Sequence, residues 1–217
     1  MWKHYELTMD VDTLVGGIPR HPEIVRRWQE ARWPAESKIG PDDPADPEAA
    51  AEATIADLGS QAIAADEAVS GLWTGFVEDD GQLCIENRNV KAMLKESANI
   101  LKSIVGKKAG KPQPLRARLA ERVFVSPRMI PLGRATPDET TERAIHVMTA
   151  QGPRTALKRT DVCRKVTVSC RLKVLDDGVI STEILEALLE HGAENGLGTD
   201  RSTGAGTFTW VLTEVGD

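Results

Sequence analysis

The chain ends in a glycine-rich segment, residues 196–206 (GLGTDRSTGAG), which restricts how its last elements can fold. Four glycines and one arginine stand here between an amphipathic segment and a final alternating one. Glycine adopts positive φ and has no side chain, so such a loop permits close backbone packing or presents N–H groups to a phosphate. The arginine favours phosphate binding. A turn that simply ends a helix is the alternative interpretation.

Charge is divided unevenly along the 217 residues. Residues 91–173 hold 19 Lys or Arg against 6 Asp or Glu, whereas the rest of the chain holds 8 against 27. A basic middle between acidic flanks predicts a stripe that binds a polyanion. The alternative is that these cations are solvated and pair with carboxylates of the acidic flanks.

Hydrophobic periodicity predicts six core elements. They are a strand at 3–11, a helix at 88–105, strands at 122–131 and 162–175, a helix at 181–194 and a strand at 207–212. This β-α-β-β-α-β order is that of the ferredoxin-like, RRM-like fold, an α+β class with an antiparallel sheet. We therefore expect one RRM-like domain over residues 1–217, with helices on one sheet face and the other face available, as in RNA-recognition domains.

The remaining segments are predicted insertions and turns. A helix is expected at 22–33, an acidic mobile or helical insertion at 34–70, and a hairpin at 72–86 with its turn at 79–81. A strand candidate at 141–148 and a basic loop at 149–160 lie within a further insertion at 133–161. The absence of an apolar run of about 18 residues predicts a cytoplasmic protein without a membrane span.

Basic side chains and the glycine-rich loop are the candidate nucleic-acid ligands, because guanidinium and ammonium groups bind phosphates. The predicted binding residues are Lys91, Lys95, Arg128, Arg143, Arg154, Lys158, Arg159, Gly198, Arg201 and Gly204. Trp28, Trp33 and Trp73 are candidates for base stacking or for core packing. With only 3 Phe and 1 Tyr, contacts are expected to fall mostly on phosphates.

Enzyme and metal patterns are sparse. The four histidines are scattered. His191 lies near the predicted C-terminus of a helix, where the helix dipole favours a histidine, so its expected role is structural. His21 and His146 lie beside basic or glycine-rich segments, where an imidazole can act as a general base. Cys84, Cys163 and Cys170 form no CxxC pair and have no histidine at metal-ligand spacing. No catalytic residue, metal or cofactor is predicted.

With this fold order, the inserted loop and the ending GLGTDRSTGAGTF, the chain resembles the RAMP superfamily of CRISPR-associated proteins, in particular the backbone subunits that coat guide RNA. The resemblance implies an RRM-like fold, a C-terminal glycine-rich loop at 196–206, a thumb-like loop at 133–161 and polymerisation along RNA. The chain is also similar to uncharacterised phage and prophage proteins in GGIP, WTGF, VFVSPR and MTAQGPR, which implies a phage-linked origin.

The predicted function is a non-catalytic subunit that coats RNA or single-stranded DNA and assembles into a homo- or hetero-oligomer. Two alternatives remain: a metal-independent RNA endonuclease of the RAMP type that uses His21 or His146, and a phage protein-interaction factor that binds no nucleic acid.

Overall fold

The computed structural model describes residues 1–20, 72–105, 114–149 and 152–216, without the side chains of 72 and 145–156. The described residues form a mixed α+β fold dominated by strands, with three α-helices, which confirms the predicted class. The predicted helix at 22–33 and insertion at 34–70 lie outside them, and so do His21, Trp28 and Trp33.

The chain divides into two compact units. Unit 1 comprises Met1–Gly16, Phe76–Glu139 and Val162–Asp217, and unit 2 comprises Gly17–Gly75 and Thr140–Asp161.

Four antiparallel strands form the main sheet of unit 1. They are β1 (Trp2–Val15), β6 (Val123–Ser126), the second half of β9 (Gly152–Leu175) and β10 (Phe208–Val215). β1 lies between β10 and β9, and β6 pairs with β9. Alternate residues of β1, beginning with Tyr5, Leu7 and Met9, are buried, which is the period of two expected of a sheet with one face in the core.

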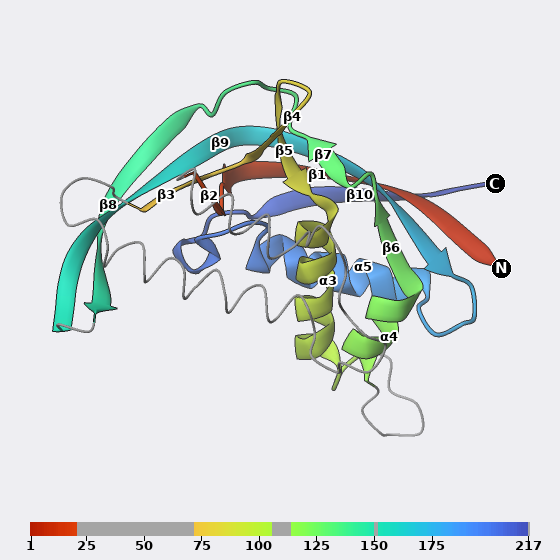
Figure 1. The fold of residues 1–217 in the computed structure, drawn as a ribbon. Coiled ribbons are helices and arrows are strands. Elements are labelled where there is room, and N and C mark those ends of the chain that lie inside the picture. Colours follow the sequence, from red (N-terminus) through yellow and green to blue (C-terminus); the bar gives the residue numbers. More distant parts are fainter. Residues whose placement is uncertain (21–71, 106–113, 150–151, 217) are drawn as a thin grey trace, which may run out of the picture. The chain divides into compact units, whose positions relative to one another are not determined.

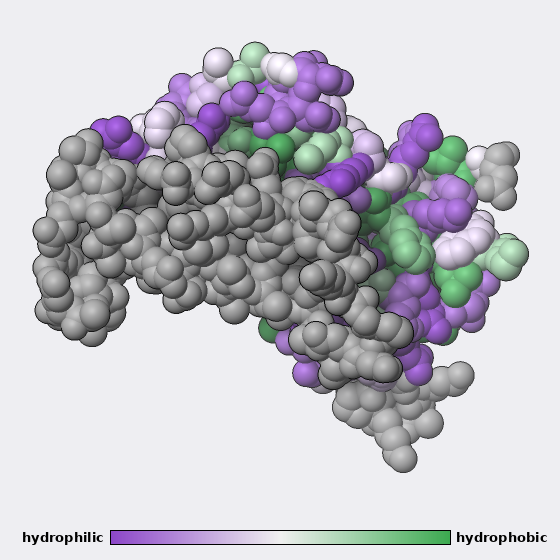
Figure 2. Space-filling view, in the orientation of Figure 1, coloured by the Kyte–Doolittle hydropathy of each residue, from purple (hydrophilic) through white to green (hydrophobic). Residues whose placement is uncertain are grey.

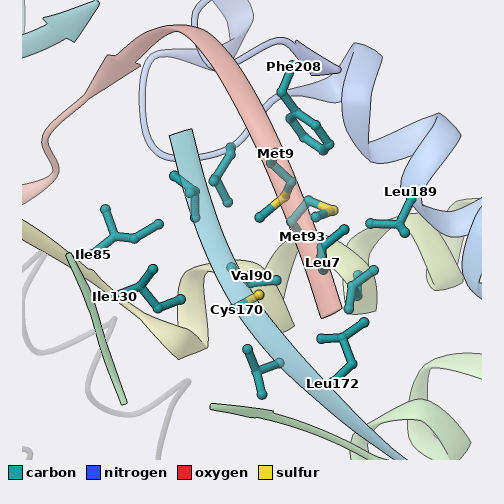
Figure 3. Close-up of a cluster of buried hydrophobic side chains, with 14 of the residues drawn as sticks. Leu7, Met9, Ile85, Val90, Met93, Ile130, Cys170, Leu172, Leu189 and Phe208 are labelled. Carbon is teal, nitrogen blue, oxygen red and sulfur yellow. The ribbon is translucent and has the colours of Figure 1, made fainter. Parts of the chain in front are cut away.

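Three helices accompany this sheet: α3 (Asn87–Leu101), α4 (Leu115–Arg122) and α5 (Thr182–Asn195). α3 and α5 lie on the same side of the sheet (Figure 1). The core forms between them and the sheet, where Leu7 and Met9 of β1 meet Met93 of α3 and Leu189 of α5 (Figure 3). The sequence analysis did not predict α4, a short helix that buries Leu115 and Leu119.

The two long helices begin differently. Ser181 caps α5, because its Oγ accepts a hydrogen bond from the Ile184 backbone N–H at 3.4 Å. Glu86 precedes α3 and makes no side-chain cap. The Asn87 side-chain amide donates to the Val125 carbonyl at 2.7 Å, which ties α3 to β6.

α3 and α5 approach closely at Gly192. A Cβ at this position would overlap the Met93 sulfur, so the contact requires glycine while Met93 keeps its present rotamer. One residue earlier, His191 Nδ1 lies 3.1 Å from the Oγ of buried Ser97. His191 therefore has a structural role between the helices.

A second, three-stranded sheet of unit 1 contains β4 (Val77–Asp79), β5 (Gln82–Glu86) and β7 (Met129–Pro131). β4 and β5 form the predicted hairpin, and its turn residues Asp80 and Gly81 have φ of 47° and 72°. The predicted strand at 122–131 is two strands, because β6 and β7 belong to different sheets. The first part of the expected hairpin, 72–75, is a separate strand in unit 2.

Unit 2 contains β2 (Ile18–Pro19), β3 (Leu72–Gly75), most of β8 (Glu139–Thr149) and the first half of β9. β3 pairs antiparallel with β2 and parallel with 158–160 of β9, and β8 also pairs with β9. The predicted strand at 141–148 lies within β8. The predicted loop at 149–160 is wrong from Gly152 onward, because this segment belongs to β9. Its apolar residues do not alternate with polar ones, so nothing in the sequence indicated a strand with one buried face.

A buried carboxylate organises the described part of unit 2. Asp161 is 1% exposed and accepts hydrogen bonds from Trp73 Nε1 and Thr140 Oγ1, both at 2.9 Å, while Arg20 Nε lies 2.9 Å from its second oxygen. A Cβ at Gly75 would overlap both members of this ion pair. Trp73, a candidate for stacking, is therefore fixed by a structural hydrogen bond.

Candidate nucleic-acid interface

The face of the unit 1 sheet that points away from the core, called the outer face here, is polar on its two central strands, β1 and β9. Its residues on β1 are His4, Glu6, Thr8 and Asp10, and on β9 they are Thr167, Ser169, Arg171 and Lys173. β1 thus contributes carboxylates to the outer face and β9 contributes cations. The outer face is divided into an acidic strip and a neighbouring basic strip.

Strand register places β6 beside the basic strip. Lys173 pairs with Phe124 on one side and with His4 on the other, and Arg171 pairs with Ser126 and Glu6. The Arg171 side chain is 74% exposed and its Nη2 lies 3.4 Å from Glu6 Oε1. An ion pair with so exposed a guanidinium is weak, so a phosphate can compete with Glu6 for Arg171.

A hollow of about 520 Å³ opens on this part of unit 1. It is lined by Glu6, Leu7, Thr8, Ser126, Pro127, Ser169, Cys170 and Arg171. Burial raises the pKa of the Cys170 thiol to about 12, so the thiol is neutral at pH 7 and is not a nucleophile. Hydroxyl groups and one guanidinium remain as the polar groups suited to an anion.

Two aromatic rings and two lysines form a cluster next to Arg171. The rings of Trp2 and Phe124 meet edge to face with their centroids 5.9 Å apart. Lys173 Nζ lies 4.7 Å from the Trp2 ring, and Lys91 Nζ lies 5.1 Å from the Phe124 ring. These four residues are called the aromatic cluster. Figure 2 shows apolar and hydrophilic residues side by side at the end of unit 1 that carries the two termini.

The predicted binding residues of unit 1 fall into separate places. Lys91 and Lys95 lie one turn apart on α3, and Lys91 also donates to the Ala120 carbonyl at 2.8 Å. Arg128 is exposed between β6 and β7, and its carbonyl accepts the Asn87 backbone N–H. Of these three, only Lys91 belongs to the aromatic cluster.

Four further predicted cations lie in unit 2. Arg143 is on β8 and Lys158 on β9, while Arg159 Nε forms an ion pair with Glu142 Oε1 at 2.5 Å. Arg154 is on β9, but its side chain is outside the described residues, as is that of His146 on β8. Arg128 and Arg143 belong to different units.

The glycine-rich loop folds tightly against itself and β1. Gly206 N–H donates to the Thr13 carbonyl and Leu197 N–H donates to the Gly206 carbonyl, both at 2.8 Å. Gly196 and Gly206 have φ of 88° and 84°, and a Cβ on either would overlap loop backbone. Close packing therefore explains these two glycines.

Gly198 and Gly204, the two predicted binding glycines, differ in their surroundings. A Cβ at Gly198 would lie 3.1 Å from Leu14 Cδ1 and from the Val15 carbonyl oxygen, whereas at Gly204 it would meet nothing within 4 Å. Arg201, on the short 3₁₀ turn η1 (Arg201–Thr203), forms an ion pair with Glu96 Oε2 of α3 at 2.5 Å. The open part of the loop is thus its tip at Gly204.

Sequence reasoning missed Trp2, Phe124, Arg171 and Lys173. The signal was present in the strand period. Val123 and Val125 are the inward residues of VFVS, so Phe124 must point outward, and the same count along β1 turns Trp2 outward. The residues of an outer face become a site only when register aligns neighbouring strands, and register is not visible in the sequence.

The described helices include none long and apolar enough to span a membrane. No family model matches the chain, and no curated protein matches it. Among solved structures it is similar to a chain of "Cryo-EM structure of the Type III-B Cmr-beta bound to cognate target RNA", with 11% identity and a TM-score of 0.49. That likeness covers 99% of this chain and 61% of the other, so this chain spans about three-fifths of its length.

Proposed function

We propose that this chain is a non-catalytic subunit that binds RNA or single-stranded DNA through phosphate contacts. The observation that carries the proposal is the basic strip of β9 on the outer face, where Arg171 lines a hollow with three hydroxyl groups and Glu6, and Lys173 lies two residues further along the strand. Guanidinium and ammonium groups in a row hold a sugar-phosphate strand without reading its sequence.

The chain order supports this reading. β1, α3, β6, β9, α5 and β10 follow one another, and their strands lie side by side in the order β10-β1-β9-β6. We infer that unit 1 is a ferredoxin-like, RRM-like domain of the RAMP type, with α4 and the β4–β5–β7 sheet as additions. In RNA-recognition domains the sheet face opposite the helices receives the nucleic acid.

The predicted cations elsewhere are proposed as a second set of phosphate contacts. Lys95, Arg128 and Arg201 belong to this set in unit 1, and Arg143, Arg154, Lys158 and Arg159 in unit 2. Gly204 at the open tip would let the strand approach the loop backbone, whereas Gly198 packs against β1. Ion pairs such as Arg201 with Glu96 must open for this contact, which exposed pairs do at low energetic cost.

Assembly is the second part of the proposal. The acidic flanks and basic middle of different copies, or of related subunits, are complementary, so one copy can meet the next in a head-to-tail contact that does not close. Such an arrangement would extend along a nucleic-acid strand.

Binding is tested by fluorescence anisotropy with a labelled 20-nucleotide oligo(U) and oligo(dT) across a KCl series. The logarithm of affinity is expected to fall linearly with the logarithm of salt, and Arg171→Gln should reduce the slope by about 0.7, the value for one lost phosphate contact on a single strand. Arg116→Gln is the matched control, because this exposed arginine lies on α4. No salt-sensitive binding, or the same slope change in both variants, would refute the outer-face interface.

Assembly is tested by light scattering with and without the same oligonucleotides. The expected mass exceeds that of one 23.6 kDa chain and grows with oligonucleotide length. A constant monomer mass at every length would refute the assembly part alone.

A further inference from the structure

We propose that the aromatic cluster is a stacking site for one unpaired nucleobase, with Phe124 as the platform and Lys91 and Lys173 as flanking cations. The inference rests on the proposed function, because it presumes that a single strand reaches the outer face. It adds a base contact to the expectation from the sequence, which placed contacts mostly on phosphates.

Exposure identifies Phe124 as the platform. Its side chain is 47% exposed although it lies in a strand whose Val123 is buried and Val125 nearly so. The Trp2 and Phe124 rings meet at an interplanar angle of 70°, so each restricts the motion of the other. Lys91 Nζ lies over one face of the Phe124 ring, so a base would stack on the opposite face. An aromatic ring held in this way presents a rigid apolar surface of the kind on which bases stack.

The lysines give the cluster a second property. Each ammonium lies within about 6 Å of a ring centroid, the range of a cation–π contact, and Lys91 is further fixed by the Ala120 carbonyl. Lys91 lies over the Phe124 ring and Lys173 over the Trp2 ring. Two positive charges therefore border the ring pair and favour a ligand that carries both a flat base and a phosphate. A nucleotide has both parts, whereas a neutral aromatic metabolite or an apolar peptide has only one.

Strand geometry connects the cluster to the hollow. Lys173 and Arg171 are two residues apart on the same face of β9, about 6.6–7 Å along the strand. A base on Phe124 therefore leaves its neighbouring phosphates within reach of Lys173 and Arg171, and places the next nucleotide beside Ser126 and Glu6. The chemical class of ligand is a single strand with at least one unstacked base.

The decisive comparison uses two labelled DNA probes of eight nucleotides: oligo(dT), and a probe of equal charge whose sugars are abasic. The wild-type chain should bind oligo(dT) about 5- to 150-fold more tightly, the range of stacking on one aromatic ring. Phe124→Leu should remove most of that preference and leave affinity for the abasic probe unchanged, while Phe124→Tyr should retain it. Ile100→Ala, an exposed apolar change on α3 and not on the outer face, is the matched control.

The outcomes separate this inference from the proposed function. Equal affinity for both probes, or a preference that survives Phe124→Leu, overturns the stacking site but leaves phosphate binding intact. Failure to bind either probe at low salt overturns the proposed function itself. A circular dichroism melt of each variant shows whether it folds, and Phe124→Tyr supplies the test if Phe124→Leu does not: loss of the preference in a folded Phe124→Tyr also overturns the site.

Discussion

Replacing Gly206 by alanine should strongly destabilise unit 1, whereas the same change at Gly204 should not. Both glycines have φ near 85°, so each substitution incurs the cost of a left-handed backbone, about 1–2 kcal/mol. At Gly206 the new Cβ would also lie 2.6 Å from the Leu197 nitrogen and closer still to its carbonyl oxygen. At Gly204 it would enter open space.

The overlap at Gly206 acts on two backbone hydrogen bonds, those with Leu197 and Thr13. Weakening both adds about 1 kcal/mol each, so the total for Gly206→Ala is about 3–4 kcal/mol. For a chain of this size each kcal/mol lowers the melting temperature by about 2–4 °C, so the variant should melt about 6–16 °C lower. Gly204→Ala should melt about 2–8 °C lower.

Urea denaturation followed by circular dichroism measures both variants beside the wild type. The difference between the two, about 2 kcal/mol, isolates the close packing from the conformational cost, because the φ angles of the two glycines match. Equal destabilisation of the two variants would show that the packing of residue 206 against Leu197 contributes nothing. Gly206 would then behave like Gly204, as a residue of the open part of the loop.

Three further outcomes follow from contacts in unit 1. Glu6→Gln removes the carboxylate that competes for Arg171, so oligo(U) affinity measured by anisotropy should rise at low salt; an unchanged or lower affinity would contradict the exposed pairing. Ser181→Ala removes the cap of α5 and should cost about 1 kcal/mol in urea denaturation, with a cost near zero as the contrary result. The hydrogen bond from Arg122 lowers the pKa of Asp177, so this pair stabilises the fold above the ordinary carboxyl pKa of 3.8 and is lost as pH falls through the lowered value. Arg122→Gln should raise the Asp177 pKa in an NMR titration, and a pKa that stays in place would show that Arg122 is not its cause.

Much of unit 1 was predictable because its elements show their buried faces in the sequence. The alternation from Tyr5 to Val11 and the helical spacing of Val90, Met93 and Leu94 each follow a single period. The first half of β9 and most of β8 lack such a period and are paired strands nonetheless. Intrinsic β-propensity does not reveal a strand that is stabilised mainly by pairing with a neighbouring strand.

The candidate site was only partly predictable for a related reason. A count of charges identified the basic middle of the chain, but Lys91, Arg201 and Arg159 each have partners that no count reveals. The outward position of Phe124 followed from its strand, whereas its contact with Trp2 depends on the pairing of three strands. The charge distribution indicated the class of ligand, whereas the strand register determines where on the sheet the candidate site lies.

The meeting of α3 and α5 ties two distant positions of the chain to a single shared volume. Because Gly192 leaves only enough room for the Met93 sulfur, a larger residue at 192 can be accommodated only if residue 93 becomes shorter or adopts another rotamer. In homologous chains these two positions should therefore change together. Alanine or serine at position 192 should occur with a smaller side chain at position 93, and methionine at position 93 should occur with glycine at position 192.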